Sequence, residues 1–80
     1  MKIDDTLNSM EYVYADILSP DQLMENDLIE YSEDGDASIV TIKDIVTLKN
    51  SCLIIAINEF GETIEFELAD DAKVKLYVLQ

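Results

Sequence analysis

Polar and apolar residues alternate without exception in Thr63-Ile64-Glu65-Phe66-Glu67-Leu68. Successive side chains of a β-strand point to opposite faces, so this order separates Ile64, Phe66 and Leu68 from the polar side chains between them. Helical spacing does not produce that separation. The stretch therefore predicts a β-strand that turns one face toward a core and the other toward water.

Similar segments lie on both sides of this strand. Downstream, residues 69–72 have turn composition and residues 73–79 alternate again. Upstream, strand-forming residues dominate residues 11–18, 28–31, 39–48 and 52–58. Strands at intervals of about ten residues, joined by short turns, are typical of an antiparallel meander that curls into a barrel or a half-open roll. We therefore predict a mainly β fold.

A chain of 80 residues has room for one hydrophobic core, and hydrophobic residues make up 49% of it. We expect a single domain over residues 11–80. Residues 1–10 show neither the helical nor the strand period, and we interpret them as a flexible or irregular N-terminal arm.

One predicted strand departs from simple alternation. Along residues 39–48, alternation places Val40, Ile42, Val46 and Leu48 on one face. Asp44 interrupts that apolar face, and Ile45 falls on the polar side. An extra residue in one strand reverses the alternation beyond it. The pattern therefore predicts a bend or β-bulge near Lys43-Asp44.

The strand at residues 52–58 is apolar on both faces. This pattern favours a central strand that is covered on both sides, or one at the core of a closed small barrel. Cys52, the only cysteine, begins the run. It has no partner for an internal disulfide, and we expect it to pack as a small buried hydrophobe.

The connections carry specific turn signals. Ser19-Pro20-Asp21-Gln22 combines an N-cap residue, a proline at the first helical position and a glutamine three residues after the serine, which predicts one helical turn. Asn26 tolerates unusual backbone angles and is expected to close that segment. Asp34-Gly35 is the strongest hairpin signal in the chain.

The region of residues 14–31 resembles the opening of SH3-like small barrels in bacterial and bacteriophage proteins. In those families a short turn ending in leucine leads to Gly-Asp and then to two apolar residues of the first long strand. The matching positions are Leu23, Asp27, Leu28 and Ile29. Asn26 stands where glycine is usual, and a left-handed backbone tolerates that exchange.

The resemblance extends loosely over residues 15–79. It implies a small antiparallel five-stranded SH3-like barrel or roll with one short helical turn. It also implies a protein similar to phage accessory proteins, anti-CRISPR proteins among them. It carries no catalytic residue across, and a fold by itself does not determine a function.

The charge is strongly one-sided. Eighteen acidic residues stand against five lysines, with no arginine and no histidine, which gives a formal net charge of −13. Such a surface repels nucleic acid and anionic membranes and favours a protein partner with a basic surface. The same charge also keeps small proteins soluble without specifying a partner, and both interpretations stay open.

The longest apolar run is far shorter than the roughly 20 residues that a membrane-spanning helix needs. With one cysteine and no disulfide framework, we expect a soluble protein in a reducing compartment. That compartment would be the cytoplasm, or the host cytoplasm for a phage-encoded chain.

The residue types argue against catalysis. Without histidine, the nucleophilic triads and the commonest general base are missing. The chain has neither a histidine nor an arginine that could activate the Cys52 thiol. Gly35 and Gly61 stand alone in turns, so there is no phosphate-binding loop. We predict that the protein is not an enzyme and that it holds no cofactor.

Residues 30–36 combine acidic side chains with Gly35 and have the composition of a calcium-binding loop. An EF-hand alignment on Gly35 places Thr41 where a bidentate glutamate belongs, so we predict a hairpin turn and no metal site.

The four tyrosines offer either a binding face or hydroxyl-bearing side chains that close the ends of the barrel, and the second role suits Tyr31.

The candidate partner-binding surface lies on and beside the strand at residues 63–68. Glu65 and Glu67 point outward two residues apart, about 6.5 to 7 Å from each other, a spacing similar in scale to that of neighbouring DNA phosphates. The candidate set is Glu59, Glu62, Glu65, Glu67, Asp70 and Asp71. Outward glutamates are also ordinary on an exposed strand, and Lys73 and Lys75 would neutralise the row if the last strand paired beside it.

Two functions follow from these patterns. The first is a non-catalytic acidic binding protein, such as a phage-encoded inhibitor or nucleic-acid mimic that engages a basic protein surface. The alternative is a structural or assembly module of a phage particle that forms homo-oligomers through a strand edge.

Overall fold

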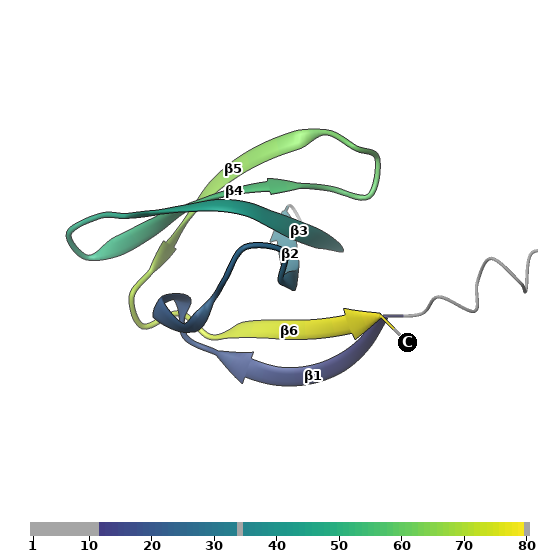
Figure 1. Ribbon diagram of the computed structural model, residues 1–80, viewed down its shortest axis with the longest axis horizontal. Helices are drawn as coiled ribbons and strands as arrows, with labels where there is room; N and C mark the ends of the chain where they lie inside the picture. The colour runs from purple at the N-terminus through teal and green to yellow at the C-terminus, as the bar shows by residue number, and fades with distance from the viewer. Residues whose placement is uncertain (1–11, 34, 80) are drawn as a thin grey trace, which may run out of the picture.

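The computed structural model describes residues 12–33 and 35–79 and consists of strands and turns (Figure 1). The strands are β1 (Tyr12–Leu18), β2 (Leu28–Glu33), β3 (Asp36–Thr47), β4 (Ser51–Ile57), β5 (Thr63–Ala69) and β6 (Val74–Leu79), with a 3-10 turn η1 (Pro20–Gln22) between β1 and β2. In the part of the chain described, no helix is long and apolar enough to cross a membrane. The predicted mainly β fold is confirmed, whereas the predicted N-terminal arm, residues 1–10, lies outside the described residues.

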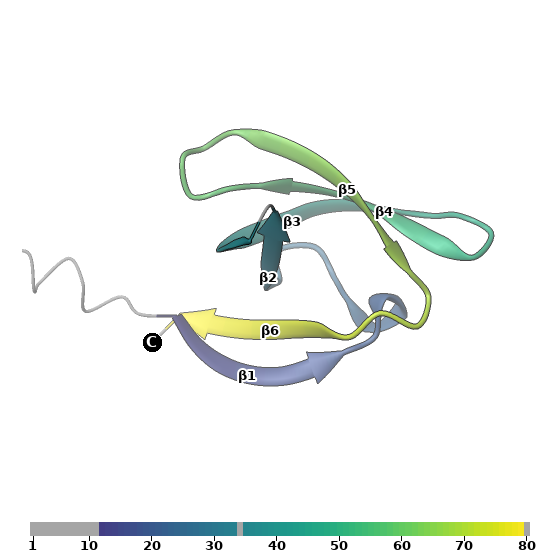
Figure 2. The same ribbon diagram turned by 180° about the vertical axis from the view of Figure 1, so that it is seen from behind.

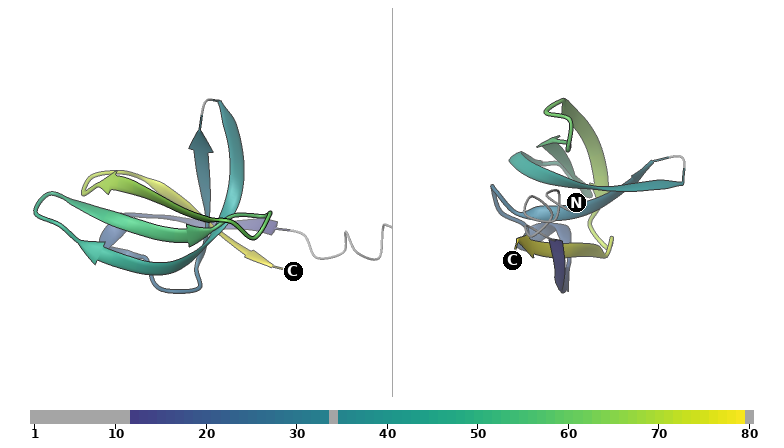
Figure 3. Two further views of the ribbon diagram at one scale, coloured as in Figure 1. Left: turned by 90° about the horizontal axis from the view of Figure 1, so that it is seen from above. Right: turned by 90° about the vertical axis from the view of Figure 1, so that its right-hand side faces the viewer.

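All strands belong to one antiparallel sheet with the order β1-β6-β2-β3-β4-β5. The sheet bends strongly, so that β6 and β1 lie on one side of the molecule and the layer of β3, β4 and β5 lies on the other, with β2 between them (Figures 1 and 2). The hairpin of β2 and β3 stands out from the rest when the molecule is seen from above (Figure 3).

The predicted five-stranded barrel is wrong, because six strands form an open sheet. Strand β6 is hydrogen-bonded to β2 on one side and to β1 on the other. Closing this sheet into a barrel would require its two edge strands, β1 and β5, to pair, whereas in the described residues β1 pairs with β6 and β5 pairs with β4. Strand β5 therefore ends the sheet.

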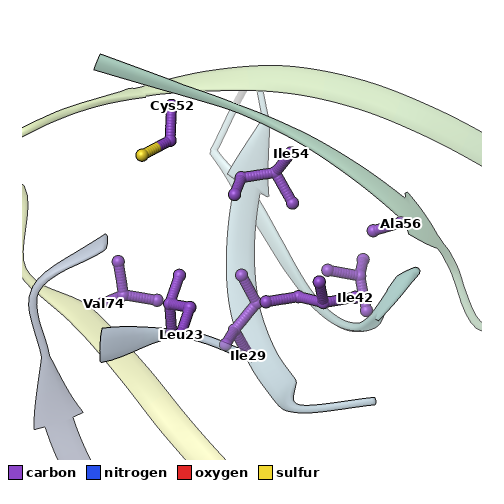
Figure 4. Packing of buried hydrophobic residues seen from close by; sticks show 8 residues of the cluster. Leu23, Ile29, Ile42, Cys52, Ile54, Ala56 and Val74 are labelled. Carbon is purple, nitrogen blue, oxygen red and sulfur yellow. The ribbon is translucent and has the colours of Figure 1, made fainter. Parts of the chain in front are cut away.

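The core lies between the two sides of the bent sheet. It is formed by the buried side chains of Leu23, Ile29, Val40, Ile42, Cys52, Ile54, Ala56 and Val74 (Figure 4). Three alternate residues of β5 pack against this cluster, and the residues between them are exposed, as their alternation predicts. Cys52 is buried among them, so its predicted packing role is confirmed.

The predicted bulge in the third strand is confirmed. Ile42 lies opposite Ala56 and Asp44 lies opposite Ile55, so Lys43 is the extra residue in β3. Beyond it Ile45 lies opposite the buried Ile54 and packs against the core.

The bulge also moves the residues that follow Ile45 to the other face. Val46 is 39% exposed and Leu48 is 42% exposed. Their predicted place on one face with Val40 and Ile42 is therefore wrong, because the extra residue shifts the phase of the strand by one position.

Strand β4 is not covered on both sides. Its burial alternates, with Cys52, Ile54 and Ala56 buried and the residues between them only half-buried. The prediction from its apolar composition is wrong because the structure has a single bent sheet, and its interior covers one face of β4.

The turn signals are confirmed. The Ser19 N–H donates to Gln22 Oε1 at 3.0 Å, which is the capping arrangement expected at η1. Asn26 has a φ of 75°, in the left-handed region that its short polar side chain tolerates. Gly35 has a φ of 88° in the turn that joins β2 to β3, where Glu33 pairs with Asp36.

Candidate functional site

The six candidate acids follow the edge strand β5 from one end to the other, and we refer to them as the acidic row. Two lie in the turn before β5, two on its outer face and two in the turn after it. All six are exposed: Glu59, Glu62, Glu65, Glu67, Asp70 and Asp71. The structure thus brings the whole predicted set together along one edge.

The middle of the row is not neutralised by the last strand. Strand β5 is bonded to β4, whereas β6 is bonded to β1 and β2, so Lys75 lies opposite Ile17 and not opposite a glutamate. The cross-strand neighbours of Glu65 and Glu67 are Ile55 and Leu53. Ile55 and Leu53 therefore flank the two central carboxylates, and Glu67 Oε2 also accepts a hydrogen bond from the Ser51 hydroxyl at 2.5 Å. The predicted alternative, in which the last strand pairs beside the row, is wrong.

Hydrogen bonds fix the start of the row. The Asn58 side chain accepts the N–H groups of Phe60 and Glu62, both at 2.9 Å, and its amide donates to Glu62 Oε1 at 3.0 Å. Gly61 completes the turn with a φ of 81°, which suits glycine. The turn between β4 and β5 is therefore held in one shape by a single asparagine.

Phe60 projects from this turn with 85% of its surface exposed, between Glu59 and Glu62. An aromatic side chain beside carboxylates is typical of an anchor at a protein interface. The candidate surface predicted from the sequence includes Glu59 and Glu62 but not Phe60. The signal that identifies Phe60 is a large apolar residue in a position where a turn normally places a polar one.

The far end of the row lies close to positive charge. The Asp70 N–H donates to the Asn50 carbonyl at 3.2 Å, which joins the turn after β5 to the turn that contains Lys49. Lys73 follows Asp71 by two residues. Net negative charge is therefore concentrated in the middle of the row and at its β4–β5 end.

A shallow hollow of about 150 Å³ adjoins that end. It is lined by Glu30, Ala37, Ser38, Ile39 and Glu59. Ligand pockets that enclose a small molecule are generally two or more times larger. Within the described residues, no group of three acidic or cysteine side chains is placed to hold a metal ion.

Glu30 is engaged inside the protein. The Tyr77 hydroxyl donates to Glu30 Oε1 at 2.8 Å, and the ring of Tyr14 meets that of Tyr77 edge-on with centroids 6.0 Å apart. The hydrogen bond to Glu30 raises the pKa of Tyr77, and partial desolvation and the nearby charge act in the same direction. Strands β2 and β3 pair as the predicted hairpin, and Tyr77 is the hydrogen-bond partner of Glu30. Tyr31 stacks on Phe66 with centroids 4.1 Å apart, so it belongs to core packing.

Stability is expected to depend on Tyr77 at high pH. Because the folded pKa is raised, the neutral hydroxyl contributes its full stability below about pH 10, where unfolded tyrosine titrates, and loses it as the pH rises further. The Tm of the wild type should therefore fall more between about pH 9 and 11 than the Tm of Tyr77→Phe. The two proteins differ at this one side chain, so the difference between the curves isolates Tyr77. Parallel curves would contradict the role of this hydrogen bond.

Comparison of the chain with protein-family models, with curated proteins and with solved structures gives no match. The resemblance to SH3-like barrels accordingly stays a prediction. Function has to be argued from the surface itself, above all from the acidic row and the aromatic residue at its start.

Proposed function

We propose that this chain is a non-catalytic binding protein that uses the acidic row to engage a basic protein surface. The observation that carries the proposal is the position of Glu65 and Glu67. Both are exposed on an edge strand, and their cross-strand neighbours are apolar. The Ser51 hydroxyl that donates to Glu67 Oε2 is neutral, so the negative charge of both carboxylates is left for a partner.

The geometry of the row supports nucleic-acid mimicry. Glu65 and Glu67 are two residues apart on one strand, about 6.5 to 7 Å, and further carboxylates continue the line at both ends. A protein that binds a phosphate backbone presents cations along such a line. The row would occupy that groove and exclude the nucleic acid, and the net charge of −13 would speed the encounter.

The resemblance to SH3-like phage proteins supports a phage-encoded inhibitor that acts in the host cytoplasm. The target would then be a host protein that handles nucleic acid. The acid-rich surface gives this chain no means of binding nucleic acid directly.

The test is affinity capture from a bacterial lysate at about 0.1 M salt, where exposed charges interact within roughly 10 Å. Three baits are compared: the wild type, the row variant Glu65→Lys/Glu67→Lys, and the matched control Glu25→Lys/Asp36→Lys. The control replaces two exposed acids outside the row, so its net charge changes by the same amount as that of the row variant. We expect the wild type and the control to retain one basic protein, which duplex DNA releases. We expect the row variant to lose it.

Equal loss from both variants would contradict the proposal, because total charge and not the row would then decide retention. Capture of basic proteins without selection, unaffected by either variant, would leave the charge as a solubilising feature.

The second candidate, self-assembly through a strand edge, is favoured by β1. This strand ends the sheet opposite β5, and Tyr12, Val13, Tyr14 and Ile17 are exposed on it. A bulge between Tyr14 and Asp16 interrupts its register, and bulges protect edges from pairing. Sedimentation at micromolar concentration separates the two functions: a monomer favours the binding protein, and a concentration-dependent oligomer favours assembly.

A further inference from the structure

The outer face of β4 carries an apolar stripe. Leu53, Ile55 and Ile57 alternate with the buried residues of the same strand and are half-buried. Seen from above, no other described element lies over β3, β4 and β5 (Figure 3). Val46 and Leu48, which the bulge turns to the outside, extend the stripe onto the end of β3 and the turn after it.

Strand register places this stripe beside the acidic row. Val46, Leu53 and Glu67 lie side by side across three strands. Neighbouring strands are about 4.8 Å apart, so each outward residue of β4 is in direct reach of the one on β5. The apolar stripe therefore borders carboxylates at Leu53 and Ile55, which lie opposite Glu67 and Glu65, whereas Ile57 lies opposite Thr63.

The opposite border is close to neutral. Asp44 lies opposite Ile55 on β3, and the exposed Lys43 of the bulge adjoins Asp44 in the chain. The surface is thus asymmetric, with negative charge along β5 only. It is complementary to a segment that has an apolar ridge and carries cations along one side of that ridge.

Charge excludes two other occupants of this face. A second copy would bring two chains of net charge −13 together along their acidic rows. Nucleic acid would meet the same repulsion and would leave the apolar stripe uncovered.

We propose that the outer face of β3, β4 and β5 docks a basic amphipathic segment of the partner. Its apolar side chains lie on Val46, Leu53 and Ile55, and its lysines or arginines follow Glu65 and Glu67. This rests on the proposed function, because the same carboxylates of the acidic row take part, and it adds an apolar contact that charge alone does not supply. Since apolar burial is insensitive to screening, part of the affinity survives at high salt.

Two synthetic peptides test the proposal. One is a helix-forming peptide with leucines at alternating intervals of three and four residues and lysines along one side of them. The other has serine in place of every leucine and the same lysines. We expect the leucine peptide to bind the full-length chain at least about tenfold more tightly by isothermal titration calorimetry, and to keep that advantage from about 0.05 to 0.3 M salt.

Variants identify the face. Ile55→Ser should make the two peptides bind alike, while the matched control Ile17→Ser, which removes an exposed isoleucine from β1 at the other edge of the sheet, should preserve the preference. Glu65→Lys/Glu67→Lys should weaken both peptides. Thermal unfolding of each variant verifies that it is folded before titration.

The outcomes separate the two proposals. If the wild type binds both peptides equally and the row variant loses both, the apolar docking face is overturned while the binding function stands. An undiminished preference in Ile55→Ser also overturns it. If the wild type binds neither peptide at low salt, the proposed function fails together with the docking face.

Discussion

Replacing Ile54 with alanine is expected to lower the free energy of unfolding by about 3 kcal/mol. Ile54 is fully buried in the core cluster (Figure 4). Its partners across the ladder are Ile45 of β3 and Phe66 of β5. The substitution removes three methyl or methylene groups and leaves a cavity that rigid strands close only in part. A domain of 80 residues is stable by roughly 4 to 12 kcal/mol, so the loss is a large share of the total.

The matched control is Ile55→Ala, one residue along the same strand. Ile55 is half-buried on the outer face, so its loss should cost about 1 kcal/mol. Urea unfolding followed by circular dichroism measures both variants. Equal losses would mean that β4 buries both of its faces, and would contradict the open outer face.

Removing one residue is expected to have opposite consequences in β3 and in β4. Lys43 has no partner across the ladder. Its deletion makes Ile42 and Asp44 adjacent, with Ile42 still opposite Ala56 and Asp44 still opposite Ile55, so the register becomes regular. We expect that variant to fold cooperatively, with about 1 to 2 kcal/mol lost because the bend at the bulge is lost.

Deleting Ile55 should unfold the protein. Ile54 and Ala56 would become neighbours, and neighbouring residues of a strand cannot face the same side. Either Ala56 or both Ile54 and Cys52 would leave the core, and β4 is bonded to β3 and β5 without a bulge of its own to absorb the change. Near-ultraviolet circular dichroism and urea unfolding distinguish the two deletions. Similar behaviour of both would contradict the assignment of Lys43 as the extra residue.

The open sheet and the proposed function are linked. If β5 had paired with β6, Lys73 or Lys75 would stand beside Glu65 and Glu67. Because β6 pairs with β1 and β2 instead, Lys75 lies opposite Ile17, Lys73 lies near the far end of the row only, and Glu65 and Glu67 keep their charge. The same arrangement leaves β5 at the end of the sheet, where a partner reaches it.

Local residue order determined the elements of this fold and the membership of the acidic row. Alternation at residues 63–68, the capping order after Ser19, the left-handed Asn26, and the Asp34-Gly35 hairpin all act within a few residues, so they are readable without coordinates. The bulge at Lys43 was readable for the same reason, because one misplaced apolar residue reveals it.

Tertiary structure alone decided which strand lies beside β6, and with it whether the sheet closes. Pairing of β1 with β6 joins segments some sixty residues apart. Both β1 and β5 are rich in strand formers, so composition does not determine which of them pairs with β6. The uncovered face of β4 has the same origin. An apolar strand looks alike in sequence whether one face or both are buried, and only the placement of the rest of the sheet determines which side chains meet water.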